Sequence, residues 1–110
     1  MQAHTELGYG FREKTYENAI VVLLKKHGIA YSQQTNFPII FHGEKIDEFI
    51  PDLIIYGKII VDVKTIDQIT NTEIGQMLNY LKVTGHKLAI IINCKNKKLE
   101  VRRVIRSSHT

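Results

Sequence analysis

The stretch that decides the fold is Pro51-Asp52-Leu53-Ile54-Ile55-Tyr56-Gly57-Lys58-Ile59-Ile60-Val61-Asp62-Val63-Lys64. Its two apolar runs flank a Tyr-Gly turn, and this pattern predicts a pair of antiparallel strands. Because both runs are continuously apolar rather than alternating, we expect these strands near the centre of a sheet, covered on both faces. Each run carries a carboxylate at its outer end, Asp52 before the first and Asp62 after the second.

These carboxylates make a candidate metal site. Asp62 and Lys64 are two residues apart on a strand, so they share a face. A three-residue turn would pair Asp52 directly with Asp62, with Cβ atoms ~5 Å apart. A two-residue turn would place them on opposite faces, although Pro51 cannot donate to a ladder and a local irregularity there could reset the register. Two carboxylates that close repel unless a divalent cation lies between them, and hard oxygen ligands suit Mg²⁺ or Mn²⁺. The competing interpretation is an ion pair between Asp62 and Lys64, with Asp52 merely ending a strand.

The residues before this stretch predict one helix and one strand-like region. Apolar side chains recur at helical spacing over 10–27, and Gly28 stands where a C-cap would be. Glu13 falls on the rim of that apolar stripe, whereas Glu17 is expected to point further toward solvent. Runs at 37–42 and 46–55 are typical of strands, with the second interrupted by Pro51. Gly43-Glu44 between them predicts a two-residue hairpin turn.

The following residues predict a second helix and two more strands. Thr70 with Glu73 three residues later forms a capping-box pattern, and Gly85 closes a helix over 70–84. Strands are expected at 88–93 and 99–105, on either side of a turn at 95–97. The order helix, three strands, helix, two strands predicts an α/β fold in which a mixed central sheet is flanked by helices. The length of 110 residues fits a single domain over 1–110, with its core at about 7–105.

Composition excludes several protein classes. With 44% hydrophobic and 24% charged residues, the chain is expected to be globular rather than disordered. No apolar run approaches the ~20 residues of a membrane span, and the first residues do not resemble a signal peptide. The single cysteine, Cys94, excludes an internal disulfide framework and a cysteine-rich zinc site, and it favours a reducing compartment such as the cytoplasm. The five histidines include no close pair, so a histidine metal site is not expected.

The charge is unevenly distributed. The net charge is +4, and residues 51–110 hold ten basic groups against five acidic ones. A basic segment of this kind is compatible with phosphate contacts. Charge alone fits a solvated, lysine-rich turn better.

Several short motifs together resemble a known family. Gly10-x-x-Glu13-x-x-Tyr16 is similar to the signature of the GxxExxY proteins, which resemble the PD-(D/E)xK nuclease superfamily. Pro51-Asp52 and Asp62-Val63-Lys64 match its PD and (D/E)xK elements, and Gln76-x-x-x-Tyr80 resembles an element of the RecB-like and lambda-exonuclease-like branch. The resemblance covers about residues 7–105. Asp62 stands where many members carry Glu, whose side chain reaches further.

The resemblance implies a restriction-endonuclease-like core and a role for each matching residue. Asp52 and Asp62 would be ligands of Mg²⁺ or Mn²⁺, Glu13 would complete the metal site, and Lys64 would be the catalytic lysine. Gln76 and Tyr80 would contact the nucleic-acid backbone or orient the lysine. Basic side chains near the end of the chain are expected to hold that backbone, with DNA favoured; these are Lys95, Lys97, Lys98, Arg102 and Arg103.

Two functions therefore fit the sequence. The first is a metal-dependent nuclease. The second is a catalytically inactive module of the same fold that binds nucleic acid or a protein partner. Clustered acids favour the first, because they repel phosphate unless a metal is present. The small size favours the second function or a need for a partner, and a homodimer is our hypothesis for that partner.

Overall fold

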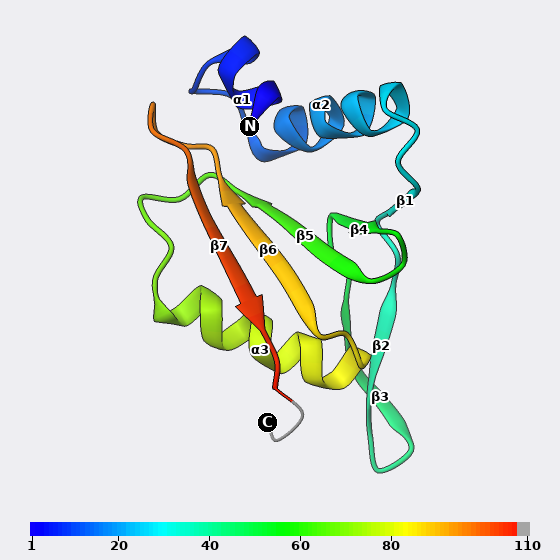
Figure 1. The fold of residues 1–110 in the computed structure, drawn as a ribbon. Coiled ribbons are helices and arrows are strands. Elements are labelled where there is room, and N and C mark those ends of the chain that lie inside the picture. The colour runs from blue at the N-terminus through cyan, green and yellow to red at the C-terminus, as the bar shows by residue number, and fades with distance from the viewer. Residues whose placement is uncertain (108–110) are drawn as a thin grey trace.

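The computed structural model describes residues 1–107, and its centre is a mixed five-stranded sheet with strand order β1-β4-β5-β6-β7 (Figure 1). The strands β5 and β6 are parallel, and the other neighbouring pairs are antiparallel. The apolar β5 is the middle strand, as its continuous apolar run predicts. The bounds are β1 (Tyr31–Gln33), β4 (Leu53–Ile55), β5 (Ile59–Lys64), β6 (Leu88–Asn93) and β7 (Glu100–Ile105).

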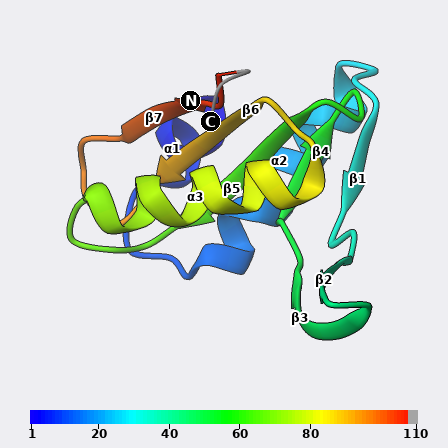
Figure 2. The same cartoon turned by 90° about the horizontal axis from the view of Figure 1, so that it is seen from below.

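Helices cover the two faces of this sheet (Figures 1 and 2). The helix α2 (Glu13–Lys26) packs on one face around the fully buried Tyr16, and α1 (Gln2–Leu7) lies against α2. The helix α3 (Asn71–Thr84) packs on the other face through Met77 and Leu81. Alternate residues of the central strands feed the two clusters, Val61 and Val63 toward α2 and Ile60 toward α3. The predicted α/β fold with a mixed sheet flanked by helices is confirmed. Within 1–107, no helix has the length and apolar character that a membrane crossing needs.

The remaining strands form a hairpin outside the main sheet. The strands β2 (Phe37–Phe41) and β3 (Glu44–Phe49) pair only with each other and project away from the body (Figure 1). Their turn is His42-Gly43, with φ angles of 49° and 80°, rather than the predicted Gly43-Glu44. Two positive φ angles fit a tight turn whose twist matches that of the strands. The sequence prediction placed the glycine first, whereas it occupies the second turn position.

The predicted run over 46–55, which Pro51 interrupts, is divided into two strands, β3 and β4. Pro51 lies between β3 and β4, which belong to different sheets, so the chain changes sheet where a proline removes a ladder donor. Two short elements, α1 and β1, were not predicted. The helix α3 begins and ends as predicted: Thr70 and Glu73 form the capping box, and Gly85 adopts the left-handed C-cap conformation.

A buried amide fixes the loop between β5 and α3. Asn93, at the end of β6, accepts a hydrogen bond from the Ile66 backbone N–H at 3.1 Å and donates to the Ile66 carbonyl at 2.8 Å. Asn93 also donates to Glu100 Oε1 at 3.1 Å, and Glu100 in turn accepts from the Ile69 N–H at 2.9 Å. Hydrogen bonds from Asn93 and then from Ile69 hold the pKa of Glu100 below its usual value. This network sets the start of α3 relative to the end of β5.

Candidate functional site

Asp52 and Asp62 meet across the β4–β5 pair. The turn between the strands has three residues, Tyr56, Gly57 and Lys58, so the last paired residues are Leu53 and Val61. One step further along this register places Asp52 opposite Asp62, and the two carboxyls interact with each other. The three-residue alternative of the sequence analysis is therefore confirmed, and the two carboxylates share a face. Tyr56 adopts a positive φ of 55° to make this turn, a conformation that is rare for an aromatic side chain.

The Asp52 carboxyl is held in an unfavourable place for its charge. Its Oδ2 accepts a 2.7 Å hydrogen bond from the Val63 backbone N–H, which favours the ionised form. Burial acts the other way and more strongly, and the nearby charges of Asp62 and Glu17 add to it. Together these effects raise the pKa of Asp52 from 3.8 to about 7. A carboxyl with such a pKa loses its proton readily when a cation arrives.

Lys64 completes this cluster. Its Nζ lies 3.3 Å from Asp62 Oδ2, and neither side chain is fully exposed. Burial alone would lower the pKa of the lysine, but the charge of Asp62, with those of Glu13 and Asp52, outweighs burial and raises it. Lys64 is therefore a cation held chiefly by Asp62, the acid that also acts on Asp52.

Glu17, rather than Glu13, is the buried acid of α2. The sequence prediction that Glu17 points toward solvent is wrong, because the residue is only 3% exposed. Burial would raise its pKa, yet hydrogen bonds from Gln33, Gln34 and Lys14 together lower it. Glu17 therefore stays ionised and adds negative charge near Asp52. The two glutamines come from β1 and the residue after it, a segment that has no amphipathic pattern in the sequence.

Glu13 lies at the exposed first turn of α2. Its Oε1 accepts a 3.1 Å hydrogen bond from the Thr65 N–H, directly after Lys64. This bond joins the helix to the end of β5. An open cleft of about 480 Å³ lies here, and its lining residues are Arg12, Glu13, Lys14, Glu17, Gln34, Asp52 and Thr65.

The acids do not form a ready-made cage for a metal. Within residues 1–107, no set of three or more His, Cys, Asp or Glu side chains is placed to hold an ion together. The Asp52–Asp62 pair nevertheless fits Mg²⁺, which proteins usually hold through one or two carboxylates plus phosphate oxygens of a substrate. The roles of Glu13, Asp52 and Asp62 as metal ligands stay predictions.

Gln76 and Tyr80 both lie on α3, four residues apart. Gln76 is exposed, and the Tyr80 ring stacks on Phe49 with centroids 4.0 Å apart. No hydrogen bond within 1–107 joins either side chain to Lys64. Tyr80 therefore contributes packing at the base of the hairpin, and contact of either residue with nucleic acid stays a prediction.

The predicted basic residues are divided between surfaces. Lys95 forms an ion pair with Asp67, while Lys97 and Lys98 are exposed in the turn between β6 and β7. That turn follows Cys94, whose N–H donates to the Lys64 carbonyl, so it lies at the same end of the sheet as the cluster. Arg102 and Arg103 are consecutive on β7 and point to opposite faces.

Solved structures with the same fold include two proteins of much greater length. The protein SSO0001 matches with a TM-score of 0.64 and 14% identity, over 82% of this chain and 48% of that one. An alkaline exonuclease from Laribacter hongkongensis matches with a TM-score of 0.60 and 12% identity, over 84% of this chain and 55% of that one. This chain thus spans about half the length of the structures it resembles. No curated protein matches its sequence.

The sequence itself carries the family relationship. A family model described as the PD-(D/E)XK nuclease superfamily matches residues 1–104, which include the Asp52–Asp62 pair and Lys64. Nearly the whole chain is covered, and the chain belongs to the PD-(D/E)XK nuclease superfamily.

Proposed function

We propose that this chain hydrolyses phosphodiester bonds of nucleic acid, with DNA favoured, and uses Mg²⁺ or Mn²⁺ held by Asp52 and Asp62. The observation that supports this most strongly is the position of Asp52 opposite Asp62, with Lys64 Nζ 3.3 Å from Asp62. Membership of a nuclease superfamily supports the same chemistry. The alkaline exonuclease among the similar structures agrees with it at the level of fold.

The metal would be held by two carboxylates and by substrate. When bound, the ion would polarise the scissile phosphate and lower the pKa of the attacking water. Asp52 must give up its proton to take part, and its raised pKa makes this step dependent on pH around neutrality. Glu13 would be the third ligand through its Oε2, while its Oε1 keeps the hydrogen bond from the Thr65 N–H.

Lys64 would act on the phosphate rather than on the metal. Its raised pKa keeps the side chain protonated at neutral pH. A fixed cation beside the scissile group offsets the negative charge that develops in the transition state. Asp62 orients Lys64 through their contact, and the ionised Glu17 keeps the local potential negative and so favours cation binding.

Several finer assignments belong to this proposal. We assign the chain to the GxxExxY group on the pattern of Gly10, Glu13 and Tyr16, and expect it to work in the cytoplasm. A homodimer stays our hypothesis, and the exposed apolar side chains Ile40, Phe41 and Ile46 of the hairpin are its candidate contacts. Light scattering that gives the monomer mass of 12.7 kDa at high concentration would exclude the dimer.

The test is a cleavage assay on purified protein. Labelled single-stranded, duplex and flap DNA, with an RNA counterpart, are incubated with Mg²⁺, Mn²⁺ or EDTA. We expect slow cleavage that needs the metal and is absent in Asp62→Asn. The exposed Asp47→Asn serves as a control, because Asp47 lies on the hairpin away from the cluster. Cleavage that persists in Asp62→Asn or in EDTA would contradict the proposal.

One observation favours the second candidate, an inactive module that binds nucleic acid or a protein. The acids within 1–107 do not converge as a three-ligand site, and Glu13 is engaged with Thr65. A chain that binds DNA equally well as wild type, Lys64→Ala and Asp62→Asn, and cuts no substrate with any metal, would be this module.

A further inference from the structure

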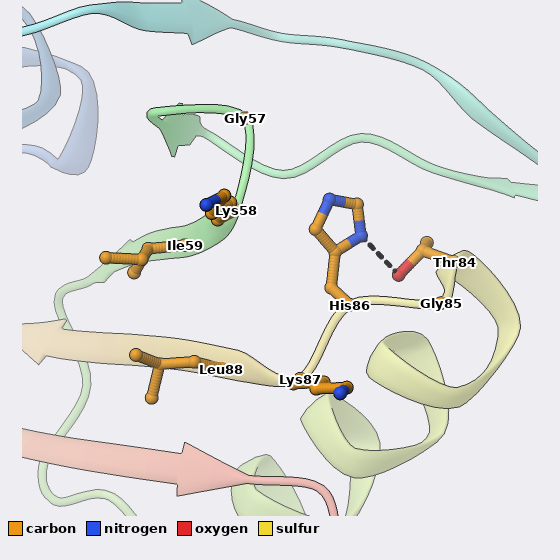
Figure 3. A pocket seen from close by; sticks show the side chains of 8 residues that line it. All are labelled: Gly57, Lys58, Ile59, Thr84, Gly85, His86, Lys87 and Leu88. Carbon is orange, nitrogen blue, oxygen red and sulfur yellow. Dashed lines mark hydrogen bonds between the residues drawn. The ribbon is translucent and has the colours of Figure 1, made fainter.

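A second hollow lies at the opposite end of β5 from Lys64. It has a volume of about 520 Å³, within the range typical of small-molecule sites (Figure 3). Since β5 runs from Ile59 to Lys64, the two ends are ~17 Å apart at the usual strand rise. The hollow is therefore separate from the acidic cluster. It is lined by the β4–β5 turn and the α3–β6 loop: Gly57, Lys58, Ile59, Thr84, Gly85, His86, Lys87 and Leu88.

The hydrogen bonds of His86 fix which ring nitrogen faces the hollow. The Thr84 hydroxyl has one proton and donates it to the Tyr80 carbonyl at 2.8 Å. The 2.9 Å contact between Thr84 Oγ1 and His86 Nδ1 is then satisfied by the tautomer whose Nδ1 carries the proton and donates it. The other nitrogen, Nε2, is left with its lone pair when the ring is neutral, and it has no hydrogen-bond partner within 1–107. Figure 3 shows the ring extending from the loop toward the turn at Gly57.

The ring is also held in place by packing. Phe37, at the base of the hairpin, meets His86 edge-to-face with centroids 5.4 Å apart. Thr84 and Phe37 together set the direction of the imidazole before any ligand arrives. A polar atom fixed in advance costs less free energy to use in binding.

Two exposed lysines line this hollow without a counter-charge. Lys58 and Lys87 directly precede Ile59 and Leu88, the first pair of the parallel ladder, so one lysine comes from each strand start. Neither lysine forms an ion pair with any residue of 1–107, and none of the eight lining residues is acidic. Ile59 and Leu88 add half-buried apolar surface beside these cations.

We propose that this hollow binds a nucleoside phosphate. The phosphate would lie between Lys58 and Lys87, and the base would pack on Ile59 and Leu88. His86 Nε2 would accept a hydrogen bond from an exocyclic amine, as adenine and cytosine offer. The ligand is either a free mononucleotide or one nucleotide of a bound strand, since both present the same chemistry. This site does not depend on cleavage at the acidic cluster.

The probe is AMP, followed through the ¹H–¹³C signals of the His86 ring in the full chain without metal. We expect saturable shifts, and a dissociation constant raised at least about tenfold, or ~1.4 kcal/mol, in Lys58→Ala/Lys87→Ala. The matched control is Lys25→Ala/Lys26→Ala, which removes the same charge from the exposed end of α2 and should bind AMP within about twofold of wild type. An unchanged His86 signal at ~10 mM AMP would overturn the site, because it excludes even millimolar affinity. Equal AMP binding by both double variants would overturn it as well.

Further ligands separate the parts of the proposal. Adenosine and inorganic phosphate should each bind more weakly than AMP, because each uses only one half of the hollow. Phosphate that binds as tightly as AMP would overturn the nucleoside part and leave an anion site only. A short single-stranded oligonucleotide that shifts His86 more strongly than AMP would identify the strand as the source. AMP binding without any oligonucleotide effect would identify a free nucleotide. Because no metal is present, absent cleavage would leave these results intact.

Discussion

Asp52 Oδ2 accepts a 2.7 Å hydrogen bond from the backbone N–H of Val63, the residue between Asp62 and Lys64. This contact ties the start of β4 to β5, the strand that carries the other two charged residues. It fixes the position of a carboxyl whose charge is opposed by burial and by its acidic neighbours. The site thus combines a fixed geometry with a carboxyl that is easily protonated, and this combination has consequences for pH.

The first prediction concerns stability without metal. The pKa of Asp52 is raised on folding from 3.8 to about 7, so the folded chain holds an extra proton between these values. The protonated Asp52 therefore adds to the stability of the folded chain below about pH 4. This contribution is lost as the pH rises through about 7. Asp52→Asn, which imitates the protonated form, should therefore raise the melting temperature at about pH 8 and leave it unchanged at about pH 4.

Mg²⁺ should reverse this dependence of stability on pH. It competes with the proton, so wild type should gain melting temperature with Mg²⁺ at about pH 8 and little at about pH 5. Asp52→Asn should lose most of the gain, while the control Asp47→Asn on the hairpin should keep it. Calorimetry of the three proteins at both pH values is the measurement. An equal response to Mg²⁺ in Asp52→Asn would mean that the metal binds elsewhere.

The second prediction distinguishes the two glutamates of α2. The charge of Glu17 raises the pKa of Asp52, so Glu17→Gln should lower that pKa. Glu13 acts instead on Lys64, so Glu13→Gln should lower the pKa of Lys64 and leave Asp52 nearly unchanged. Carboxyl and ammonium titrations by NMR measure both groups. A shift of Asp52 in Glu13→Gln but not in Glu17→Gln would contradict this assignment.

The third prediction concerns the loop that joins the site to α3. Asn93→Ala would leave two partly buried polar groups of Ile66 without these partners and should lower the free energy of unfolding by about 2 kcal/mol. Amide exchange at Ile66 and Ile69 should accelerate with it. The control is Asn96→Ala, which loses one exposed hydrogen bond to the carbonyl of Asp67 and should cost less than about 0.5 kcal/mol. Equal unfolding energies for the two variants would show that the loop is held by other contacts.

Sequence alone predicted the features that depend on local signals. The capping pair of Thr70 and Glu73 and the glycine at 85 fixed the ends of α3, because each acts within one helical turn. The apolar runs on both sides of Gly57 identified the central strands, because burial on both faces leaves no alternation. The acidic pair followed from those strands, provided that the turn had three residues.

The sequence left the length of this turn open and missed the buried acid of α2. The three-residue turn requires a left-handed Tyr56, which its residue type does not favour. Glu17 is buried because Gln33 and Gln34 reach it from β1, a three-residue strand that is too short to show a periodicity. A glutamate followed by an apolar helix face gives no sign of such partners. The buried acid of α2 could therefore be recognised only once the sheet had been assembled.

The fourth prediction concerns nucleic-acid binding. Lys97→Ala/Lys98→Ala should reduce the slope of log K against log salt concentration by about two. Lys95→Ala should change the slope less, because Lys95 already pairs with Asp67. Lys25→Ala/Lys26→Ala is the control for net charge. Fluorescence anisotropy with a labelled oligonucleotide at several salt concentrations provides the slopes. An equal reduction of the slope in both double variants would show that only net charge matters.

The last prediction separates the roles of Lys64 and Asp62. Lys64→Ala should keep Mg²⁺ and nucleic-acid binding and lose cleavage roughly 100- to 1000-fold, because it removes only a transition-state contact. Asp62→Asn should lose metal binding and cleavage together, since it removes one of the two carboxylates. The two residues touch at 3.3 Å, so a general disturbance of the strand would affect both variants alike. Metal titration calorimetry and single-turnover cleavage, measured on the same preparations, give the contrast. Loss of Mg²⁺ binding in Lys64→Ala would mean that the lysine organises the acidic pair rather than the phosphate.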